Sequence, residues 1–169
     1  MGNKESLPRG CVQFMSAGTG VAHSEMNDSS DTCRFLQLWI TPDRRGHAPQ
    51  YGSSIYSKAD RHNRLLHILG GTGQAPAWPQ SHSPNSIHLH QDANVYVSES
   101  DPGTTFDVSL GARRQAYLVC IEGDMSVNGV QLGQRDGARL LGGDGATSLS
   151  MTAGAAGAHF LMVEMPGSS

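Results

Sequence analysis

Hydrophobic and polar positions alternate over many short segments, and no stretch sustains the 3.6-residue period of an amphipathic helix. Residues 34–41 (RFLQLWIT) are nearly continuously apolar and rich in strand-forming residues, which predicts a strand covered on both faces. Residues 115–122 (QAYLVCIE) predict a second buried strand. Asn128-Gly129 predicts a hairpin, because a type I′ turn favours Asn-Gly. The other expected strands are 11–15, 21–26, 51–56, 64–69, 86–91, 93–99, 104–110, 125–127, 130–132, 139–141, 147–151 and 159–164.

About a dozen short strands with turn residues between them predict an all-β sandwich or barrel. Composition agrees, because Gly makes up 21 of 169 residues and charged residues only 16%, which suits tight turns better than a helical bundle. Residues 70–85 hold clusters of Gly, Pro and Ser and predict a long irregular excursion, of the kind that is disordered or forms a lid.

Charge and cysteine content narrow the class of protein. A net charge of −3 offers no basic surface for direct binding of nucleic acid. Three scattered cysteines, Cys11, Cys33 and Cys120, predict free thiols in a reducing compartment, hence a cytoplasmic location. No apolar run approaches the roughly 18–20 residues of a membrane span. Gly2 with Ser6 fits the short pattern of N-myristoylation.

Several motifs together resemble one family. Residues 12–25 (VQFMSAGTGVAHSE) resemble a segment of the pirins, and residues 35–40 (FLQLWI) resemble their next strand. Residues 90–93 (HQDA), the hairpin 123–129 and residues 136–138 (DGA) continue the match. The resemblance runs from about Cys11 to Met165 and implies a cupin-type (RmlC-like) β-barrel or jelly-roll sandwich.

The resemblance also implies a domain organisation. Pirins are usually double cupins, and the metal site of their first barrel combines an upstream HPHxGFE strand with the later HSE. This sequence has HSE at residues 23–25 but no HPHxGFE before it. We therefore expect a chain with a truncated first barrel: a flexible tail over 1–10, a remnant of the metal-binding barrel over 11–30, and the C-terminal cupin domain over 31–169.

His23 and Glu25 are the first candidate site. Side chains two apart on a strand share one face, so an imidazole and a carboxylate can approach one metal ion, a donor pair suited to Fe(II) and similar divalent ions. The resemblance implies that His23 and Glu25 are two of four iron ligands and that Glu25 also serves as the base for a substrate hydroxyl. The other interpretation is that both are solvent-exposed relics, since the remaining two histidines are missing.

His88 and His90 form a second candidate pair with the same spacing. Asp92 and His159 could add donors, whereas Glu99 comes too late for the cupin metal motif. The alternative is that these histidines are structural and hydrogen-bonded, and the resemblance favours it, because the second barrel of pirins is generally free of metal.

Other residues are assigned structural roles. The aromatic residues Phe35, Trp39 and Tyr117 are predicted in the barrel core. His62 and His67 are placed in a polar connector, and the sequence names no partner for either.

The resemblance implies three hypotheses for function. The first is a metal-dependent quercetin 2,3-dioxygenase, which opens the ring of a flavonol with release of carbon monoxide. The second is a non-catalytic binding or regulatory cupin, like the nuclear transcription-cofactor pirins. The third is a fragment without independent activity. The missing histidine pair predicts weak or no activity for this chain alone, and the unpaired strands of the first barrel predict self-association.

Overall fold

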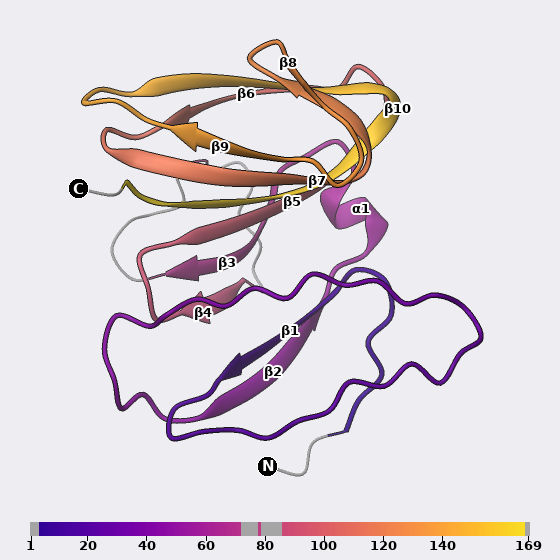
Figure 1. Cartoon of the computed structure of the whole chain (residues 1–169), viewed down its shortest axis with the longest axis vertical. Helices are drawn as coiled ribbons and strands as arrows, with labels where there is room; N and C mark the ends of the chain where they lie inside the picture. Colours follow the sequence, from indigo (N-terminus) through magenta and orange to yellow (C-terminus); the bar gives the residue numbers. More distant parts are fainter. Residues whose placement is uncertain (1–3, 72–77, 79–85, 168–169) are drawn as a thin grey trace.

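The chain folds into two β-sheets of unequal size, and the computed structural model describes residues 4–71, 78 and 86–167 (Figure 1). The larger sheet has eight strands, with the order β4-β3-β5-β10-β7-β8, β6 pairing with β10, and β9 with β7. The smaller sheet is the antiparallel pair β1–β2. The all-β prediction is confirmed. The elements are β1 Cys11–Ser16, β2 Gln50–Ile55, α1 Lys58–Arg61, β3 Leu66–Gly71, β4 Ile87–Leu89, β5 Asn94–Ser100, β6 Thr105–Leu110, β7 Arg114–Val127, β8 Val130–Leu132, β9 Gly137–Leu141 and β10 Thr147–Pro166.

Strand β10 organises the larger sheet. Its first half pairs with β6, its second half pairs with β5, and β7 runs beside it over most of its length. The strands predicted over 147–151 and 159–164 are therefore one strand, which bends at two register shifts, one between Ala153 and Ala158 and one at His159. Bulges of this kind bend a strand and re-aim its side chains.

At the bend of β10, the backbones of β7 and β10 approach so closely that there is room only for glycine. Gly123 and Gly157 both have positive φ, and a Cβ on Gly123 would lie 2.0 Å from the carbonyl oxygen of Gly157. We expect Gly123→Ala to lower the free energy of unfolding by about 3 kcal/mol, since it adds a backbone clash to left-handed strain.

Gly129 provides the matched control. It also has a positive φ, but a Cβ there would meet nothing within 4 Å, so Gly129→Ala should cost only the strain, about 1 kcal/mol. Urea denaturation of both variants measures the difference. Equal losses of unfolding free energy in the two variants would show that the close backbone approach at Gly123 does not contribute to stability.

Two apolar clusters lie on opposite faces of the larger sheet. The main core fills the interior of the barrel with residues such as Tyr96, Leu118, Met125, Phe160 and Met162. A smaller cluster covers the outer face, where Tyr56, Leu66, Ile68, Val95 and Leu161 are buried and Val12 of β1 packs against them. Burial of this apolar surface holds the smaller sheet against the barrel.

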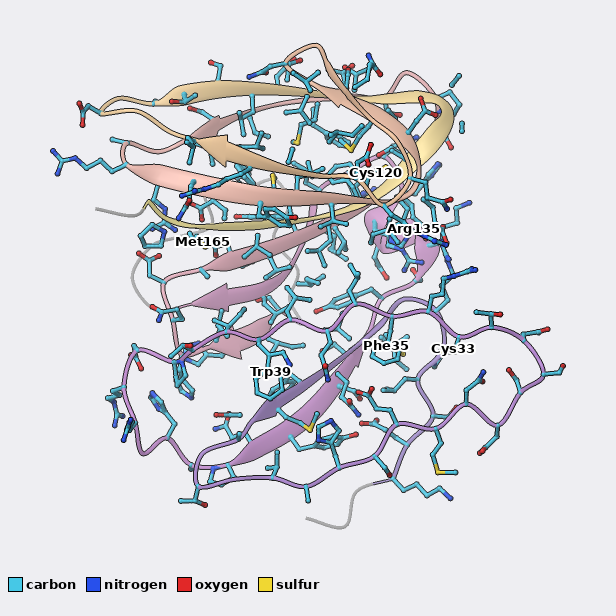
Figure 2. All side chains as sticks on the ribbon, in the orientation of Figure 1. Cys33, Phe35, Trp39, Cys120, Arg135 and Met165 are labelled. Atoms are coloured by element: carbon cyan, nitrogen blue, oxygen red, sulfur yellow. The ribbon has the colours of Figure 1, made fainter. Side chains whose placement is uncertain are left out.

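The strand predicted over residues 34–41 is wrong. Residues 17–49 run as irregular chain near β1 and β2 in the lower part of Figure 1, so the strand predicted over 21–26 is also absent. Phe35 and Trp39 are 63% and 88% exposed (Figure 2). An apolar run becomes a strand only where a neighbouring strand pairs with its backbone, and among the described residues none pairs with this one.

The prediction that Phe35, Trp39 and Tyr117 lie in the core is wrong as well. Tyr117 does lie on β7, but it points to the outside and is 48% exposed. The buried aromatic residues are instead Tyr56, Trp78, Tyr96 and Phe160.

The histidines of the predicted polar connector do have partners. His62 follows α1, and its Nε2 lies 2.9 Å from Oδ2 of Asp101. His67 is buried in β3, and its Nε2 lies 3.0 Å from Oδ1 of Asn94. Both partners come from β5 or the residue after it, 39 and 27 positions further along the chain, so hydrophobic periodicity does not predict these contacts.

Part of the sequence predictions falls outside the described residues. Gly2 lies there, as do residues 72–77 and 79–85 of the predicted excursion. Trp78 is buried and donates a hydrogen bond to the carbonyl oxygen of Ser109. No helix among the described residues is long and apolar enough to cross a membrane.

Candidate functional site

His23 and Glu25 come together without a strand to place them. Both lie in irregular chain, and His23 Nε2 is 4.0 Å from Glu25 Oε1. Their side chains are 37% and 38% exposed, so an ion from solvent can reach both. The pair fits half of a metal site: it offers one nitrogen and one oxygen donor and leaves the other positions to water or to another chain. Across the described residues, no group of three His, Cys, Asp or Glu side chains is arranged to hold a metal ion.

The residues of the second predicted metal site do not come together in the structure. The ring of His90 stacks on His47 at 3.8 Å between centroids and meets His88 edge-on at 5.0 Å. Desolvation lowers the pKa of His90, and the neighbouring His47 and His88 lower it further. Asp92 instead pairs with Arg114, and His159 belongs to another cluster.

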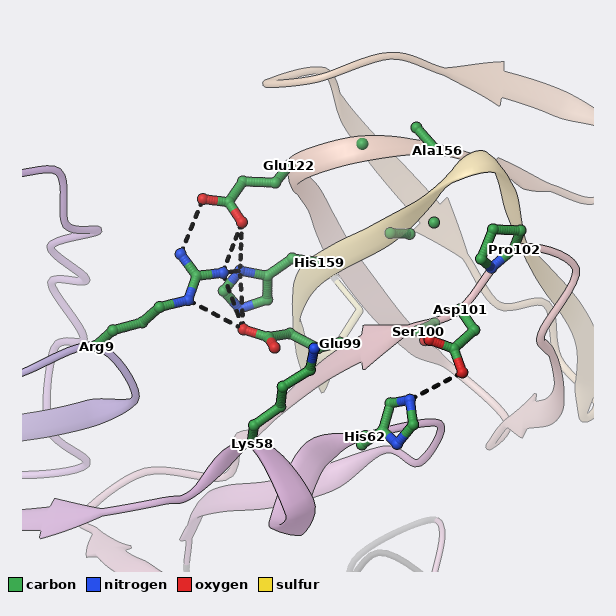
Figure 3. Close-up of a pocket in the computed structure, with 13 residues that line it drawn as sticks. Arg9, Lys58, His62, Glu99, Ser100, Asp101, Pro102, Glu122, Ala156 and His159 are labelled. Atoms are coloured by element: carbon green, nitrogen blue, oxygen red, sulfur yellow. Dashed lines mark hydrogen bonds and ion pairs between the residues drawn. The ribbon is translucent and has the colours of Figure 1, made fainter.

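That cluster is a cross-strand row of three side chains. Glu99 on β5, His159 on β10 and Glu122 on β7 are paired positions in adjacent antiparallel strands, so they share one face of the sheet. Arg9 reaches this row from the segment before β1 (Figure 3). The row lines a pocket of about 290 Å³, which also includes Lys58 and Asp101.

Arg9 is bound by both carboxylates. Its two Nη atoms donate to the two oxygens of Glu122 at 3.0 and 2.6 Å, while Nε and Nη2 donate to one oxygen of Glu99 at 3.3 and 2.9 Å. Nη2 also lies 3.3 Å from Nδ1 of His159. Arg61 of α1 donates to the same oxygen of Glu99 at 3.0 Å. Bidentate pairs of this kind are strong and directional.

The pKa values follow from these contacts. The hydrogen bonds from Arg9 lower the pKa of Glu122 to about 2, against partial desolvation. Burial alone would raise the pKa of Glu99, but hydrogen bonds from Arg61 and Arg9 bring it below its ordinary value. Burial lowers the pKa of His159.

A second polar network is buried at the other end of these strands. Glu164 accepts hydrogen bonds from Nε and Nη2 of Arg114 and from Nδ2 of Asn94. Asn94 in turn contacts His67, and Arg114 donates to Asp92 at 2.7 Å. Glu164 and Arg114 are 1% and 7% exposed, so the network is structural.

A groove lies between the smaller sheet and β4. Its volume is about 500 Å³, within the usual range for small-molecule sites. Apolar side chains of Phe14, Ile55 and Ile87 line it together with polar groups of Ser53 and His88.

Family models match at both ends of the chain. One, described as Pirin, matches residues 1–40, and one described as the quercetinase C-terminal cupin domain matches residues 79–165, half of the chain. The chain belongs to the pirin family. This pirin thus has the cupin fold that its motifs imply, and it is related to quercetin 2,3-dioxygenases.

Known relatives support the assignment. This pirin is 37% identical to a pirin-like protein of Caulobacter vibrioides, over 83% of the chain and 57% of the relative. It is 30% identical to the quercetin 2,3-dioxygenase of Escherichia coli K12, over 81% of the chain and 54% of the relative. The crystal structure of YhhW from Escherichia coli matches 99% of the chain and 65% of YhhW, with a TM-score of 0.78 and 25% identity. YhhW has also been solved in complex with nickel(II), with a TM-score of 0.77. The chain spans a little over half the length of the curated relatives that it matches.

Sequence reasoning missed Arg9 and Glu122. His159 was expected only as a possible further metal donor, Glu99 was set aside as too late in the chain for the metal motif, and Arg9 was expected in a flexible tail. The only sequence signal for this cluster was weak: single charged residues at outward-facing positions of otherwise apolar strands. Whether these charged side chains come together depends on the register between the strands.

Proposed function

We propose that this pirin is a cupin module for quercetin 2,3-dioxygenase chemistry, in which His23 and Glu25 contribute half of a metal site. The observation that supports it is the approach of His23 Nε2 and Glu25 Oε1 to 4.0 Å, with both groups open to solvent. The name of the Escherichia coli relative and the nickel complex of YhhW agree with a metal and a flavonol-like ligand. Because two donors leave most of the coordination sphere to water, we propose weak metal binding and weak or no turnover by this chain alone.

Each residue has a distinct part in this proposal. His23 supplies the imidazole nitrogen, and Glu25 supplies a carboxylate oxygen that also faces His23. The second oxygen of Glu25 is then free to take the proton of a flavonol hydroxyl, the role of a general base. When bound, an Fe(II) ion would supply the redox chemistry of ring opening.

Metal titration tests the half-site. We expect isothermal titration with Ni²⁺ or anaerobic Fe²⁺ to show weak binding, and His23→Ala or Glu25→Gln to weaken it at least about tenfold, since each removes one of two donors. His62→Ala is the matched control, because His62 is an exposed histidine whose partner is Asp101. Loss of quercetin absorbance, followed in parallel, reports turnover separately from binding. If the His23 and Glu25 variants bind like the wild type, the proposed site is wrong.

The second candidate is a binding module without catalysis. The groove of about 500 Å³ beside Phe14 and His88 favours it, because it combines apolar walls with a few polar groups. In the same titrations, quercetin binding that does not depend on added metal would support this alternative.

The organisation of the chain remains a proposal. We propose that residues 11–30 belong to a metal-binding barrel, that residues 31–169 form the C-terminal cupin domain, and that exposed apolar residues near β1–β2 allow self-association. A cytoplasmic location and myristoylation of Gly2 also stay predictions, to be checked by cell fractionation and by the mass of the N-terminal peptide.

A further inference from the structure

The segment before β1 is fastened to the barrel at one point. Arg9 makes four hydrogen bonds to Glu99 and Glu122 across the outer face of the sheet. Its neighbour Gly10 accepts a hydrogen bond from the backbone N–H of Tyr56, and a Cβ on Gly10 would lie 2.4 Å from Nη1 of Arg61. The contact therefore joins the N-terminal segment, the end of β2 and α1 to the barrel.

The charges in this contact balance only while His159 is neutral. The guanidinium groups of Arg9 and Arg61 face the carboxylates of Glu99 and Glu122, two charges of each sign. The side chain of His159 lies between the two carboxylates and is only 19% exposed. A proton on it would give the cluster an excess positive charge, at the side of the cluster where His159 and Glu99 are largely shielded from water.

The geometry also opposes a proton on His159. Its Nδ1 lies 3.3 Å from Nη2 of Arg9, so it can accept from Arg9 only while it carries no proton. Once protonated, Nδ1 repels Arg9 and competes for Glu122 and Glu99, whose oxygens are 3.6 and 3.9 Å away. Arg9 is 58% exposed, so it can leave for solvent, whereas His159 cannot.

We propose that Arg9 and the Glu99–His159–Glu122 row form a pH-sensitive latch, which holds the N-terminal segment on the barrel while His159 is neutral and releases it when His159 is protonated. Two further charged groups line the pocket. Lys58 of α1 adds to the repulsion of a second cation, whereas Asp101 is negative and its Oδ2 is already bound by His62 and Asn63, each at 2.9 Å.

The pH range follows from the titrating groups. The carboxylates of Glu99 and Glu122 stay charged, because their pKa values are lowered. Burial lowers the pKa of His159 below the value of about 6.5 of an unfolded chain. The unfolded chain then binds the proton more readily than the folded chain, so the stability that the closed latch provides is present above pH ~6.5 and is lost as the pH falls through the lowered pKa.

Hydrogen exchange of the full chain tests the latch. We expect the protection of the amides of Cys11 and Tyr56, which donate to the carbonyl oxygens of Pro8 and Gly10 in this segment, to fall about tenfold between pH 7.5 and pH 5 in the wild type, after correction for the intrinsic pH dependence of exchange. His159→Asn keeps an acceptor near the position of Nδ1 but cannot titrate, so its protection should stay high at both pH values. Arg9→Met should be weakly protected at both.

Two references make the test decisive. Peptides of β7 and β10 should stay protected in all variants, which shows that the barrel is folded. His62→Asn removes the other histidine of the pocket and should behave like the wild type. The proposal is overturned if wild-type protection does not depend on pH, if the dependence survives in His159→Asn, or if His159→Asn is open at both pH values.

Discussion

Glu164→Ala is expected to lower the free energy of unfolding by about 3–5 kcal/mol, because it leaves a buried guanidinium without its main partner. Glu164 is 1% exposed and binds Arg114 through two hydrogen bonds and Asn94 through a third. Asp92, the remaining partner of Arg114, contacts only Nη1 and is itself one-third exposed. Guanidinium denaturation, read as a shift of the midpoint at constant slope, measures the loss.

The neighbouring ion pair supplies the control. Arg113 and Asp144 lie 3.6 Å apart, but their side chains are 85% and 98% exposed. Asp144→Ala should therefore change stability by less than about 1 kcal/mol. The double variant Arg114→Met/Glu164→Met should recover much of the loss, since it removes both buried charges. A loss as small in Glu164→Ala as in Asp144→Ala would contradict the structural role of the network.

The second large effect concerns association between chains. We expect the wild type to self-associate as its concentration rises, and Phe35→Ser/Trp39→Ser to weaken that association at least tenfold. These two side chains are 63% and 88% exposed on a segment that also exposes Leu36 and Leu38. Large aromatic residues dominate the energetics of interfaces, and exposed apolar patches favour association. Light scattering coupled to size-exclusion chromatography, over a hundredfold range of concentration, gives the dissociation constants.

Val130→Ser/Leu141→Ser is the matched control for the double variant. Val130 on β8 and Leu141 on β9 are 65% and 62% exposed. Replacing them removes exposed apolar surface from a different part of the molecule. This control should associate like the wild type. A wild type that stays monomeric over the whole concentration range would show that the exposed segment does not drive association.

The strands of the C-terminal half were predicted well. Residues 104–110, 130–132 and 139–141 lie close to the observed β6, β8 and β9, and Asn128-Gly129 turns between β7 and β8 as expected. These strands have short alternating patterns and turn residues that specify local backbone geometry, so neighbouring positions alone suffice. The divisions of β7 (115–122 and 125–127) and of β10 into two strands each were errors of the same local method, because Gly123 in β7 and Gly154 and Gly157 in β10 mark bends rather than ends.

The strand predicted over residues 34–41 shows the limit of that method. Its pattern correctly describes side chains suited to a covered position, but whether anything covers them depends on other strands. His23 and Glu25 were expected to meet because they would share one face of a strand. That strand is absent, yet the two side chains still approach each other. The expected proximity is therefore observed, but the reason given for it does not hold.

Local chemistry along the chain was enough to predict an all-β fold, most strands of its barrel and the proximity of His23 and Glu25, and the resemblance of its motifs added the pirin family. Only the folded chain brings Arg9 to Glu99, Glu122 and His159, which are 90, 113 and 150 positions away, or buries Arg114 against Glu164. Turn and alternation signals depend on adjacent residues, whereas these contacts depend on strand order, register and the shift at His159, which are set by the packing of the whole sheet.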